Sequence, residues 1–551
     1  MNRNNILKSS ILMFILGLVT SCGDLLDLEP PMTQVTENFY RDQNDAFQAL
    51  TSAYNILNWS APSTASGSPQ NCAFEIVSEI LGDACYAGGA NANDIPTTGR
   101  INTFEMRVND PAPEALWYKY FTGIYRANQL LVKIDNIKFV DENLRTRYKA
   151  EALFLRANYY FDVVRLFGNV PLILTPITPA DYGQEQVAPE IIYKQIAEDL
   201  LEAINAKDSE GSYSLPTSSL QLDAADKGRV TRAAAQSLLA RVWLYYTGYY
   251  QQNQLPEVSA QDIVGYIEDV IENSGHDLMP NAYDREYTLA SKTSPLFDVA
   301  NKNNIEGVFE IQYTDLSKWG DWKNRQGCLG NQAVILWGMR DVGGVYAAGW
   351  SFAPVSKTLF DRFEANDPRR LATFINAEPA VGDNDGEGLN YTKGYQNTGF
   401  FNRKFTPLTA NNCRYGGTRE LNYRNNYPMI RFADVLLMGA ELELLYGDKA
   451  KALTYYKRVR ERAMGAGSVN LSQNQLTLDL IDKERIYELS LEGHRYWDIL
   501  RRGQDYADKT LTNGETNEFS VIYNKTRAGL MPIPQYDISQ SKGSLKQNPG
   551  Y

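Results

Sequence analysis

The feature that most constrains the fold is a helical repeat of apolar side chains in residues 144–168, LRTRYKAEALFLRANYYFDVVRLFG. Apolar residues recur there at spacings of three and four, which places them on one face of an α-helix. They are Leu153, Ala157, Tyr160, Val164 and Phe167. Gly168 follows at a position where glycine commonly ends a helix. The segment therefore predicts a long helix with one buried face.

Further segments have the same character. Two begin near Pro113 and Pro189, with proline in the first turn, and residues 228–250 are rich in alanine and leucine, which favour helix. Gly447 and Asp448 separate two periodic segments, as in an αα-hairpin. The second of these segments places four residues on one face, namely Ala452, Tyr456, Val459 and Ala463. We expect a mainly α fold of stacked, tetratricopeptide-like helix pairs, without a clean repeat period through the whole chain.

Residues 280–425 differ in composition and pattern: glycine, asparagine and aromatic residues are interspersed there without a sustained period. This pattern predicts long surface loops with short strands. Because binding sites commonly lie on loops held by a rigid framework, we expect a ligand-binding region here. The length of 551 residues and a hydrophobic share of 43% predict one large compact unit or two closely fused ones.

The N-terminal residues have the pattern of an export signal. Arg3 and Lys8 precede a short apolar run, which is shorter than the roughly 20 residues that span a bilayer. Residues 19–22, VTSC, resemble a bacterial lipobox, in which Cys22 carries lipid and becomes the new N-terminus. We expect residues 1–21 to be a lipoprotein signal peptide; a plain signal peptide with a chance cysteine is the alternative.

Charge and reactive residues exclude several function classes. Loss of residues 1–21 removes two positive charges and takes the net charge from −12 to −14, and no basic patch is present, so nucleic acid is not an expected partner. The remaining cysteines contain no C-x-x-C pair, and Cys72 with Cys85 would close a short loop if oxidised. The chain has only two histidines, so a zinc site or a Cys/His nucleophile pair is not expected. We expect no cofactor and no metal.

Three sets of segments, taken together, resemble the SusD-like (RagB/SusD) family of outer-membrane nutrient-binding lipoproteins. The first is residues 151–172, EALFLRANYYFDVVRLFGNVPL, with residues 228–246. The second joins residues 427–445 to residues 484–503, ERIYELSLEGHRYWDILRRG, and the third is the C-terminal segment that ends in NPGY. With the lipobox at the other end, the resemblance covers essentially the full length.

The resemblance implies a helix-pair scaffold, mainly residues 36–275 and 427–503 of a mature chain 22–551, around a loop-rich region at about 280–425. It also implies a non-enzymatic lipoprotein, lipid-anchored to the outer membrane and exposed at the cell surface. Its partners would be an oligosaccharide or polysaccharide and a TonB-dependent (SusC-like) transporter. Peptide capture within the same family, a surface glycoside hydrolase and a purely protein-binding scaffold remain alternatives.

In this family the segment after the second helical region tends to line the glycan site. Here it corresponds to residues 79–96, EILGDACYAGGANANDIP, and the candidate ligand residues are Asp83, Tyr86, Asn91 and Asn93. Carboxylate and amide groups bond sugar hydroxyls, and an aromatic ring supplies a stacking face. A turn-rich loop without a ligand remains the alternative.

The middle loops supply a second set of candidates, Trp319, Trp322, Trp337 and Trp350, with Arg325 as a polar anchor. Trp319 and Trp322 lie three residues apart among polar neighbours, which would not normally bury both. Aromatic residues are abundant, with 35 tyrosines and 8 tryptophans, and most of them are expected simply to pack helices together.

Two other patterns invite a chemical interpretation. Asp383, Asp385 and Glu387 alternate like the start of a calcium loop, but Gly394 stands where such a loop requires glutamate, so a solvated acidic turn is favoured. In residues 484–503 we expect Leu489, Trp497 and Leu500 to face the core and Arg495, Asp498 and Arg501 to form ion pairs. His494 is expected to be a packed or solvent-facing histidine, not a general base.

Overall fold

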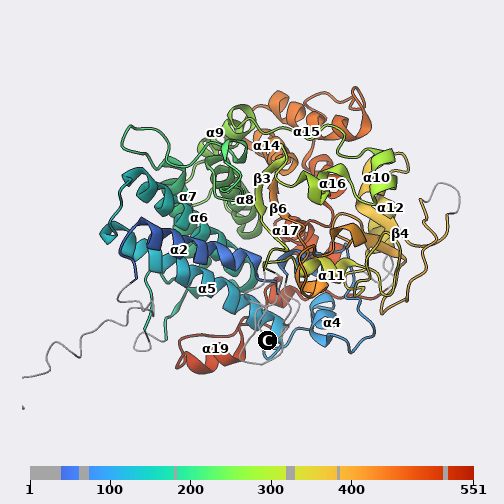
Figure 1. Ribbon diagram of the computed structural model, residues 1–551, viewed down its shortest axis with the longest axis horizontal. Helices are drawn as coiled ribbons and strands as arrows, with labels where there is room; N and C mark the ends of the chain where they lie inside the picture. The colour runs from blue at the N-terminus through green and yellow to red at the C-terminus, as the bar shows by residue number, and fades with distance from the viewer. Residues whose placement is uncertain (1–38, 61–72, 179–182, 318–328, 381–384, 513–518) are drawn as a thin grey trace, which may run out of the picture.

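The computed structural model of the chain describes residues 39–60, 73–178, 183–317, 329–380, 385–512 and 519–551, and it is mainly helical, as predicted (Figure 1). The helices of the N-terminal half are α2 (Gln43–Tyr54), α3 (Phe74–Leu81), α4 (Pro96–Asn102), α5 (Pro111–Lys133), α6 (Glu142–Phe167), α7 (Pro189–Asn205), α8 (Arg232–Tyr250) and α9 (Ala260–Asn273). The later helices are α10 (Arg285–Ser291), α11 (Ala333–Trp337), α12 (Lys357–Arg362), α13 (Pro368–Thr373), α14 (Phe432–Tyr446), α15 (Lys449–Met464), α16 (Leu478–Leu489), α17 (Arg495–Leu500), α18 (Gln504–Leu511) and α19 (Gln535–Gln540). The strands are short and pair in antiparallel twos, β1 (Val170–Pro171) with β2 (Gln186–Val187), β3 (Gly307–Ile311) with β6 (Tyr427–Arg431), and β4 (Phe374–Asn376) with β5 (Phe400–Asn402).

Neighbouring long helices pack in sequence order. Helix α5 packs against α6, α6 against α7, and α7 against α8. Helix α9 contacts both α8 and α14, and α14 in turn contacts α15 and α16. In Figure 1 the first group lies on the left and α14 and α15 lie at the upper right, with α9 beside α14. This arrangement confirms the predicted stack of helix pairs and shows that α9 joins its two groups.

The helix ends follow the local sequence signals. Helices α5 and α7 begin at Pro111 and Pro189, where the missing proline N–H costs no hydrogen bond. Gly168 ends α6 with a φ of +70°, a conformation that favours glycine. Asp448 caps α15 by accepting a hydrogen bond from the N–H of Ala450 at 2.7 Å. The predicted αα-hairpin is therefore α14 and α15.

Helix α6 differs from its prediction because it is buried on every side. All residues from 150 to 167 are buried, since α2, α5 and α7 pack around this helix. Its polar side chains are accommodated by pairing: Arg156 donates to the carboxylate of Asp199 on α7 at 2.6 and 2.7 Å. The periodic face therefore identified the helix correctly but understated its burial.

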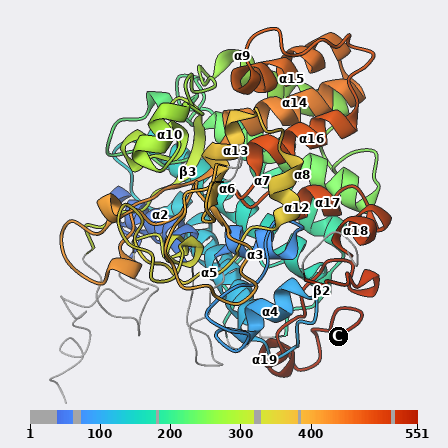
Figure 2. The ribbon, with the colours of Figure 1, turned by 90° about the vertical axis from the view of Figure 1, so that its right-hand side faces the viewer.

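The loop-rich stretch is attached to the second helix group through a strand pair. Strand β3 pairs with β6, which leads directly into α14, and Ile311 lies opposite Tyr427. Figure 2 shows that the loops of residues 338–425, drawn in yellow to orange, gather along one side of the molecule. The helices thus hold one long irregular region at one face.

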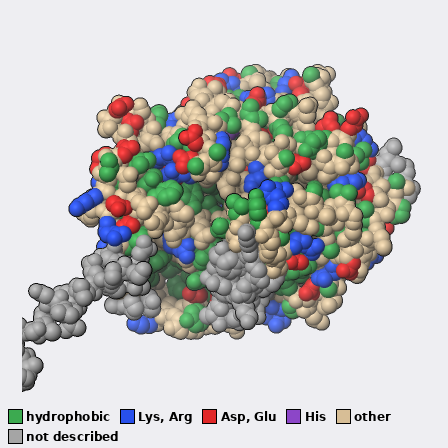
Figure 3. All heavy atoms as spheres, in the orientation of Figure 1, with side chains coloured by type: hydrophobic (Ala, Val, Ile, Leu, Met, Phe, Trp, Pro, Cys, Tyr) green, Lys and Arg blue, Asp and Glu red, His purple; other side chains and the backbone are tan. Residues whose placement is uncertain are grey.

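The described surface carries mixed charge. On the face in Figure 3, acidic and basic side chains are interspersed, and the described residues there form no continuous basic area. This agrees with the overall net charge of −12. Among the described helices, none combines the length and the apolar composition that a bilayer-spanning segment needs.

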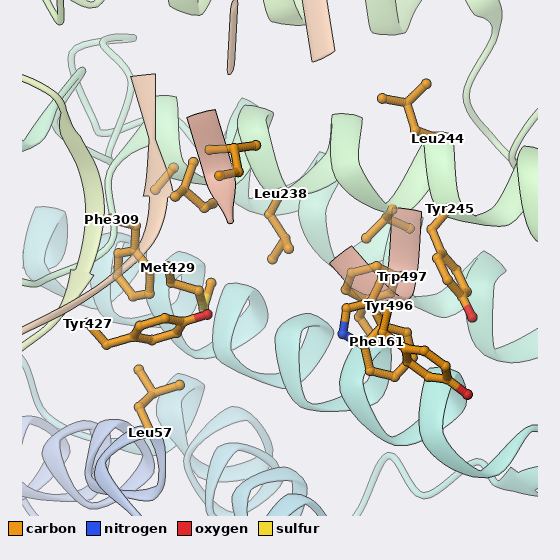
Figure 4. Packing of buried hydrophobic residues seen from close by; sticks show 14 of the residues in the cluster. Leu57, Phe161, Leu238, Leu244, Tyr245, Phe309, Tyr427, Met429, Tyr496 and Trp497 are labelled. Carbon is orange, nitrogen blue, oxygen red and sulfur yellow. The ribbon is translucent and has the colours of Figure 1, made fainter. Parts of the chain in front are cut away.

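Aromatic side chains from three helices meet in the core. Figure 4 shows Phe161 of α6, Tyr245 of α8 and Trp497 of α17 close together. The ring centroids of Phe161 and Tyr245 are 5.8 Å apart, and those of Tyr245 and Trp497 are 6.0 Å apart. Leu489 and Leu500 are also buried, which confirms the predicted core-facing residues of this segment. Burial of each such side chain contributes about 1.5–3 kcal/mol.

Candidate ligand-binding site

The loop that follows α3 lies against the segment that follows α11. Antiparallel backbone bridges join Cys85 to Val355 and Gly88 to Phe352. These bridges bring the candidate residues of 83–93 together with the segment that carries Trp350. Two sets of residues that are far apart in sequence thus belong to one part of the surface.

A third segment, residues 391–398, completes this junction. The side-chain Oε1 of Gln396 accepts hydrogen bonds from the N–H groups of Ala87 at 2.9 Å and Gly88 at 3.3 Å. One amide side chain therefore satisfies two backbone donors of the neighbouring loop and fixes the two segments to each other.

The junction is tightly built and locally strained. A Cβ added at Gly394 would lie 2.3 Å from the carbonyl oxygen of Gly89, so only glycine fits there. Ser351, Ala353 and Gln396 all have φ near +50°, which side chains rarely adopt. Such strain persists only where the surroundings enforce it, and it gathers at functional sites.

Asp83, at the start of this loop, is buried. Its carboxylate accepts two hydrogen bonds from Arg495, at 2.8 and 3.0 Å, and Arg362 lies 2.8 Å away. Burial alone would raise the pKa of Asp83, but the charges of the two arginines outweigh it and hold the pKa below its ordinary value. Asp83 therefore supports the loop as a buried ion-pair partner.

The other three candidates of this loop differ in exposure. Tyr86 is buried and makes an edge-to-face contact with Phe519, with ring centroids 4.9 Å apart. Asn91 and Asn93 are exposed, and the Asn91 side chain accepts a hydrogen bond from the Asn93 N–H at 2.9 Å. The loop is thus a turn, as the alternative predicted, and it also displays amide groups.

The two candidate tryptophans that the structure describes, Trp337 and Trp350, are placed differently from each other. Trp337 ends the apolar helix α11 and is only 1% exposed, whereas Trp350 is half-buried and packs on the edge of the core. Four further residues fall outside the described part of the chain, namely Trp319, Trp322, Arg325 and Cys22.

The calcium-like turn is held by cationic side chains. Arg285 donates to Asp385 at 3.0 Å, and Arg403 donates to Glu387 at 2.6 Å; Asp383 lies outside the described residues. Burial would raise the pKa of Glu387, but the charge of Arg403 lowers it below its ordinary value. Both carboxylates line an open pocket of about 790 Å³. With arginines paired to them, these two carboxylates are occupied as structural ion pairs.

The predicted ion pairs at α17 are present with one difference. Asp498 accepts from Arg501 and from Arg485, each at 2.9 Å, whereas Arg495 turns to Asp83 instead. Burial lowers the pKa of His494 to about 4, so its ring is neutral at pH 7. A neutral, buried imidazole beside these pairs is the packed histidine that the sequence predicts.

Two cysteines lie in the described part of the chain. Cys85 is a buried free thiol, and Cys413 is a half-buried one. Among the residues that the structure describes, no group of three or more His, Cys, Asp and Glu side chains is placed to hold a metal ion.

A fully buried ionic network was not predicted from the sequence. It ties α13, the segment after β5 and strand β6 to α16 and the turn after it. Arg369 donates to Glu484 at 2.5 Å, and Arg431 donates to Glu492 at 2.6 Å. Its buried members include Arg369, Lys404, Arg431, Asp367, Glu306, Glu484, Glu488 and Glu492. The network fixes the loop-bearing region to the helical scaffold.

Three further residues of the junction were not among the candidates predicted from the sequence, namely Arg340, Asp94 and Tyr395. Arg340 donates to Asp94 at 2.6 Å, across 246 residues of sequence. Only the glycines of the two loops, Gly89 and Gly394, hint in the sequence at the close approach that brings these residues together.

Stacked helix pairs with an inserted loop-rich region define the structural class of this protein. The chain belongs to the SusD family: the family model described as "SusD family" matches residues 305–551, and the model described as "Starch-binding associating with outer membrane" matches residues 24–244. A curated relative, "SusD-like protein P2" of Formosa agariphila, is 27% identical, and the match covers 99% of each chain.

Solved structures agree with this assignment. The "Surface glycan-binding protein A from Bacteroides thetaiotaomicron in complex with laminarihexaose" is 27% identical with a TM-score of 0.78, and the match covers 92% of this chain and 99% of that one. A "Laminarin binding SusD-like protein" is 30% identical with a TM-score of 0.75, and the match covers 93% of this chain and 100% of that one. The predicted family and fold class are confirmed.

Proposed function

We propose that this chain binds a glycan at the cell surface and passes it, chemically unchanged, to a TonB-dependent transporter of the outer membrane. The observation that carries the proposal is the likeness, over 92% and 93% of this chain, to solved proteins that hold laminarihexaose or bind laminarin. Laminarin is therefore the first glycan to test, and starch is the second, because the N-terminal half matches a family model described as starch-binding.

The binding face is the junction of residues 86–95, 338–352 and 391–398. Asn91 and Asn93 supply exposed amide donors and acceptors for sugar hydroxyls, and Trp350 supplies a partly open ring. Trp319 and Trp322, with Arg325, remain predicted stacking and anchoring residues from the sequence, outside the described part of the chain.

Binding without catalysis agrees with the state of the nearby carboxylates. A glycoside hydrolase needs two carboxyl groups about 5–10 Å apart that face the scissile bond. Asp83 is buried against Arg495 and Arg362, and Asp94 is paired with Arg340, so both carboxylates already have cationic partners.

Affinity electrophoresis tests the proposal. The protein should be retarded in gels that contain laminarin or starch, and Trp319→Ala or Trp322→Ala should reduce that retardation. Tyr536→Ala is the matched control, because Tyr536 is exposed on α19, in a different part of the chain. Retardation by a peptide-coupled gel, but by no glycan, would instead favour the peptide-binding alternative.

The anchor and the partner need separate tests. We propose that Cys22 carries the lipid that holds the chain to the outer membrane, through several acyl chains, because one chain binds a membrane only marginally. Cys22→Ala should abolish lipid labelling and release the protein from the membrane fraction; an unchanged distribution would refute the anchor. Co-purification of a TonB-dependent barrel with the native lipoprotein would support the transfer step.

A further inference from the structure

Tyr395 is an exposed aromatic residue on a rigid support. Its side chain lies on the outside of the junction, and the residue is 39% exposed. Its backbone N–H donates to the carbonyl oxygen of Gly89 at 2.8 Å, and the next residue, Gln396, holds the N–H of Ala87 at 2.9 Å. Backbone fixed on both sides of an open ring loses little further entropy when a ligand stacks on it.

The same loop contains a second tyrosine whose role is clearly structural. The ring of Tyr391 packs edge-to-face on Phe401 with centroids 5.4 Å apart, and its hydroxyl donates to Asn397 at 3.0 Å. Tyr391 therefore anchors the loop to the core. The exposure of Tyr395 is not needed to hold the loop in place.

A charged pair belongs to the same junction as Tyr395. The Arg340 Nη2 donates to the Asp94 Oδ2 at 2.6 Å, and that oxygen also accepts from the N–H of Ala90 at 2.8 Å. The Arg340 carbonyl accepts from the N–H of Thr392 at 2.9 Å, three residues before Tyr395. A chain of direct hydrogen bonds thus connects the pair to the loop that carries the ring.

The pair keeps free hydrogen-bonding capacity. The side chains of Arg340 and Asp94 are 25% and 29% exposed. Within the described part of the chain, the Arg340 Nη1 and the Asp94 Oδ1 make no hydrogen bond. The pair therefore offers one set of donors and one acceptor to a ligand, and its two charges cancel.

We propose that Tyr395, Arg340 and Asp94 form a subsite for one uncharged pyranose ring, an inference that rests on the glycan-binding function proposed above. The Tyr395 ring stacks on the C–H face of the sugar, while Asp94 accepts from one hydroxyl and Arg340 donates to its neighbour. Because the pair is neutral as a whole, the subsite selects an uncharged sugar over a uronate.

Calorimetric titration with laminarihexaose tests the stacking role. Tyr395→Ala should weaken binding about tenfold or more, which corresponds to about 1.4 kcal/mol, whereas Tyr395→Phe keeps the ring and should stay within about twofold. Tyr536→Ala, an exposed tyrosine on α19, should leave binding unchanged. Equal affinity of the wild type and Tyr395→Ala would overturn the subsite.

The preference of the subsite for an uncharged sugar over a uronate has its own test. Asp94→Asn keeps the side chain's shape but leaves the Arg340 charge uncompensated, so the ratio of affinities for a hexauronate and for laminarihexaose should shift several-fold toward the hexauronate. An unchanged ratio would overturn the selection rule.

Chemical protection separates this inference from the proposed function. Laminarihexaose should protect Tyr395, but not Tyr536, from nitration by tetranitromethane, as read by peptide mass spectrometry of the wild-type protein. If the wild type binds none of the glycans, the proposed function fails; if it binds and Tyr395 is nitrated at the same rate, only the subsite fails.

Discussion

Arg495 donates two hydrogen bonds to the buried carboxylate of Asp83, at 2.8 and 3.0 Å, across 412 residues of sequence. This pair joins α17, near the C-terminus, to the start of the loop that carries the candidate site. Helix α17 therefore stabilises the site, in addition to the loops that neighbour it.

We expect Asp83→Asn to destabilise the protein by about 3–5 kcal/mol, because it leaves buried arginine charge without its partner. The free energy of unfolding from urea denaturation, monitored by circular dichroism, measures the effect. Lys357→Gln is the control: its pair with Asp361 is 54% exposed on both sides, so its removal should cost no more than about 0.5 kcal/mol. A loss of similar size in both variants would contradict the supporting role of Asp83.

Gly394→Ala should weaken glycan binding more than it weakens the fold. Its new Cβ would meet the carbonyl of Gly89 at 2.3 Å and push the two loops apart, while the helical core stays intact. Gly265→Ala is the matched control, because Gly265 lies on α9, outside the junction, and a Cβ there meets nothing within 4 Å. Calorimetry with laminarihexaose and a thermal melt should separate binding from stability; equal binding by both variants would contradict the interlocked junction.

The long helices were predictable because their signals are local. Prolines at the starts of α5 and α7, Gly168 after α6 and the Gly447–Asp448 turn all act within a few residues. The loop junction was not predictable, since the pairing of Gly88 with Phe352 spans nearly half of the chain and leaves no periodic pattern.

The sequence indicated candidate residues for the site, but not how the fold places each of them. The segment 79–96 and Trp350 do meet at one face, but Asp83 is buried because its partners, Arg362 and Arg495, come from distant helices. Trp337 is buried because it completes the apolar run of α11, although polar and glycine-rich residues follow it. Sequence reasoning weighs near neighbours, and these outcomes depend on remote ones.

His494 should make the protein sensitive to mild acid. Burial lowers its folded-state pKa to about 4 from an ordinary value of 6.5, so its contribution to stability is fully present above about pH 6.5 and is lost as the pH falls to about 4. Relative to His494→Gln, the free energy of unfolding of the wild type should fall by about 3 kcal/mol over that interval. Urea titrations from pH 7 to pH 4 test this, and parallel curves for the two proteins would contradict it.

Glu79, in contrast, should make the protein less stable as the pH rises. Burial raises its folded-state pKa to about 8 from an ordinary value of 4.5. Its Oε2 has no hydrogen-bond partner in the described residues. Its contribution is fully present below about pH 4.5 and is lost as the pH rises to about 8. Relative to Glu79→Gln, the wild type should lose up to about 4 kcal/mol of unfolding free energy between pH 5 and pH 8. A difference that does not change with pH would show that Glu79 is already ionised in the folded protein.

The most direct test of the central claim is calorimetric titration of the purified protein with laminarihexaose, followed by chromatography of the sugar after prolonged incubation. The account predicts saturable binding and recovery of the intact hexasaccharide. Absence of binding to laminarihexaose, laminarin and starch, or release of shorter sugars, would contradict it.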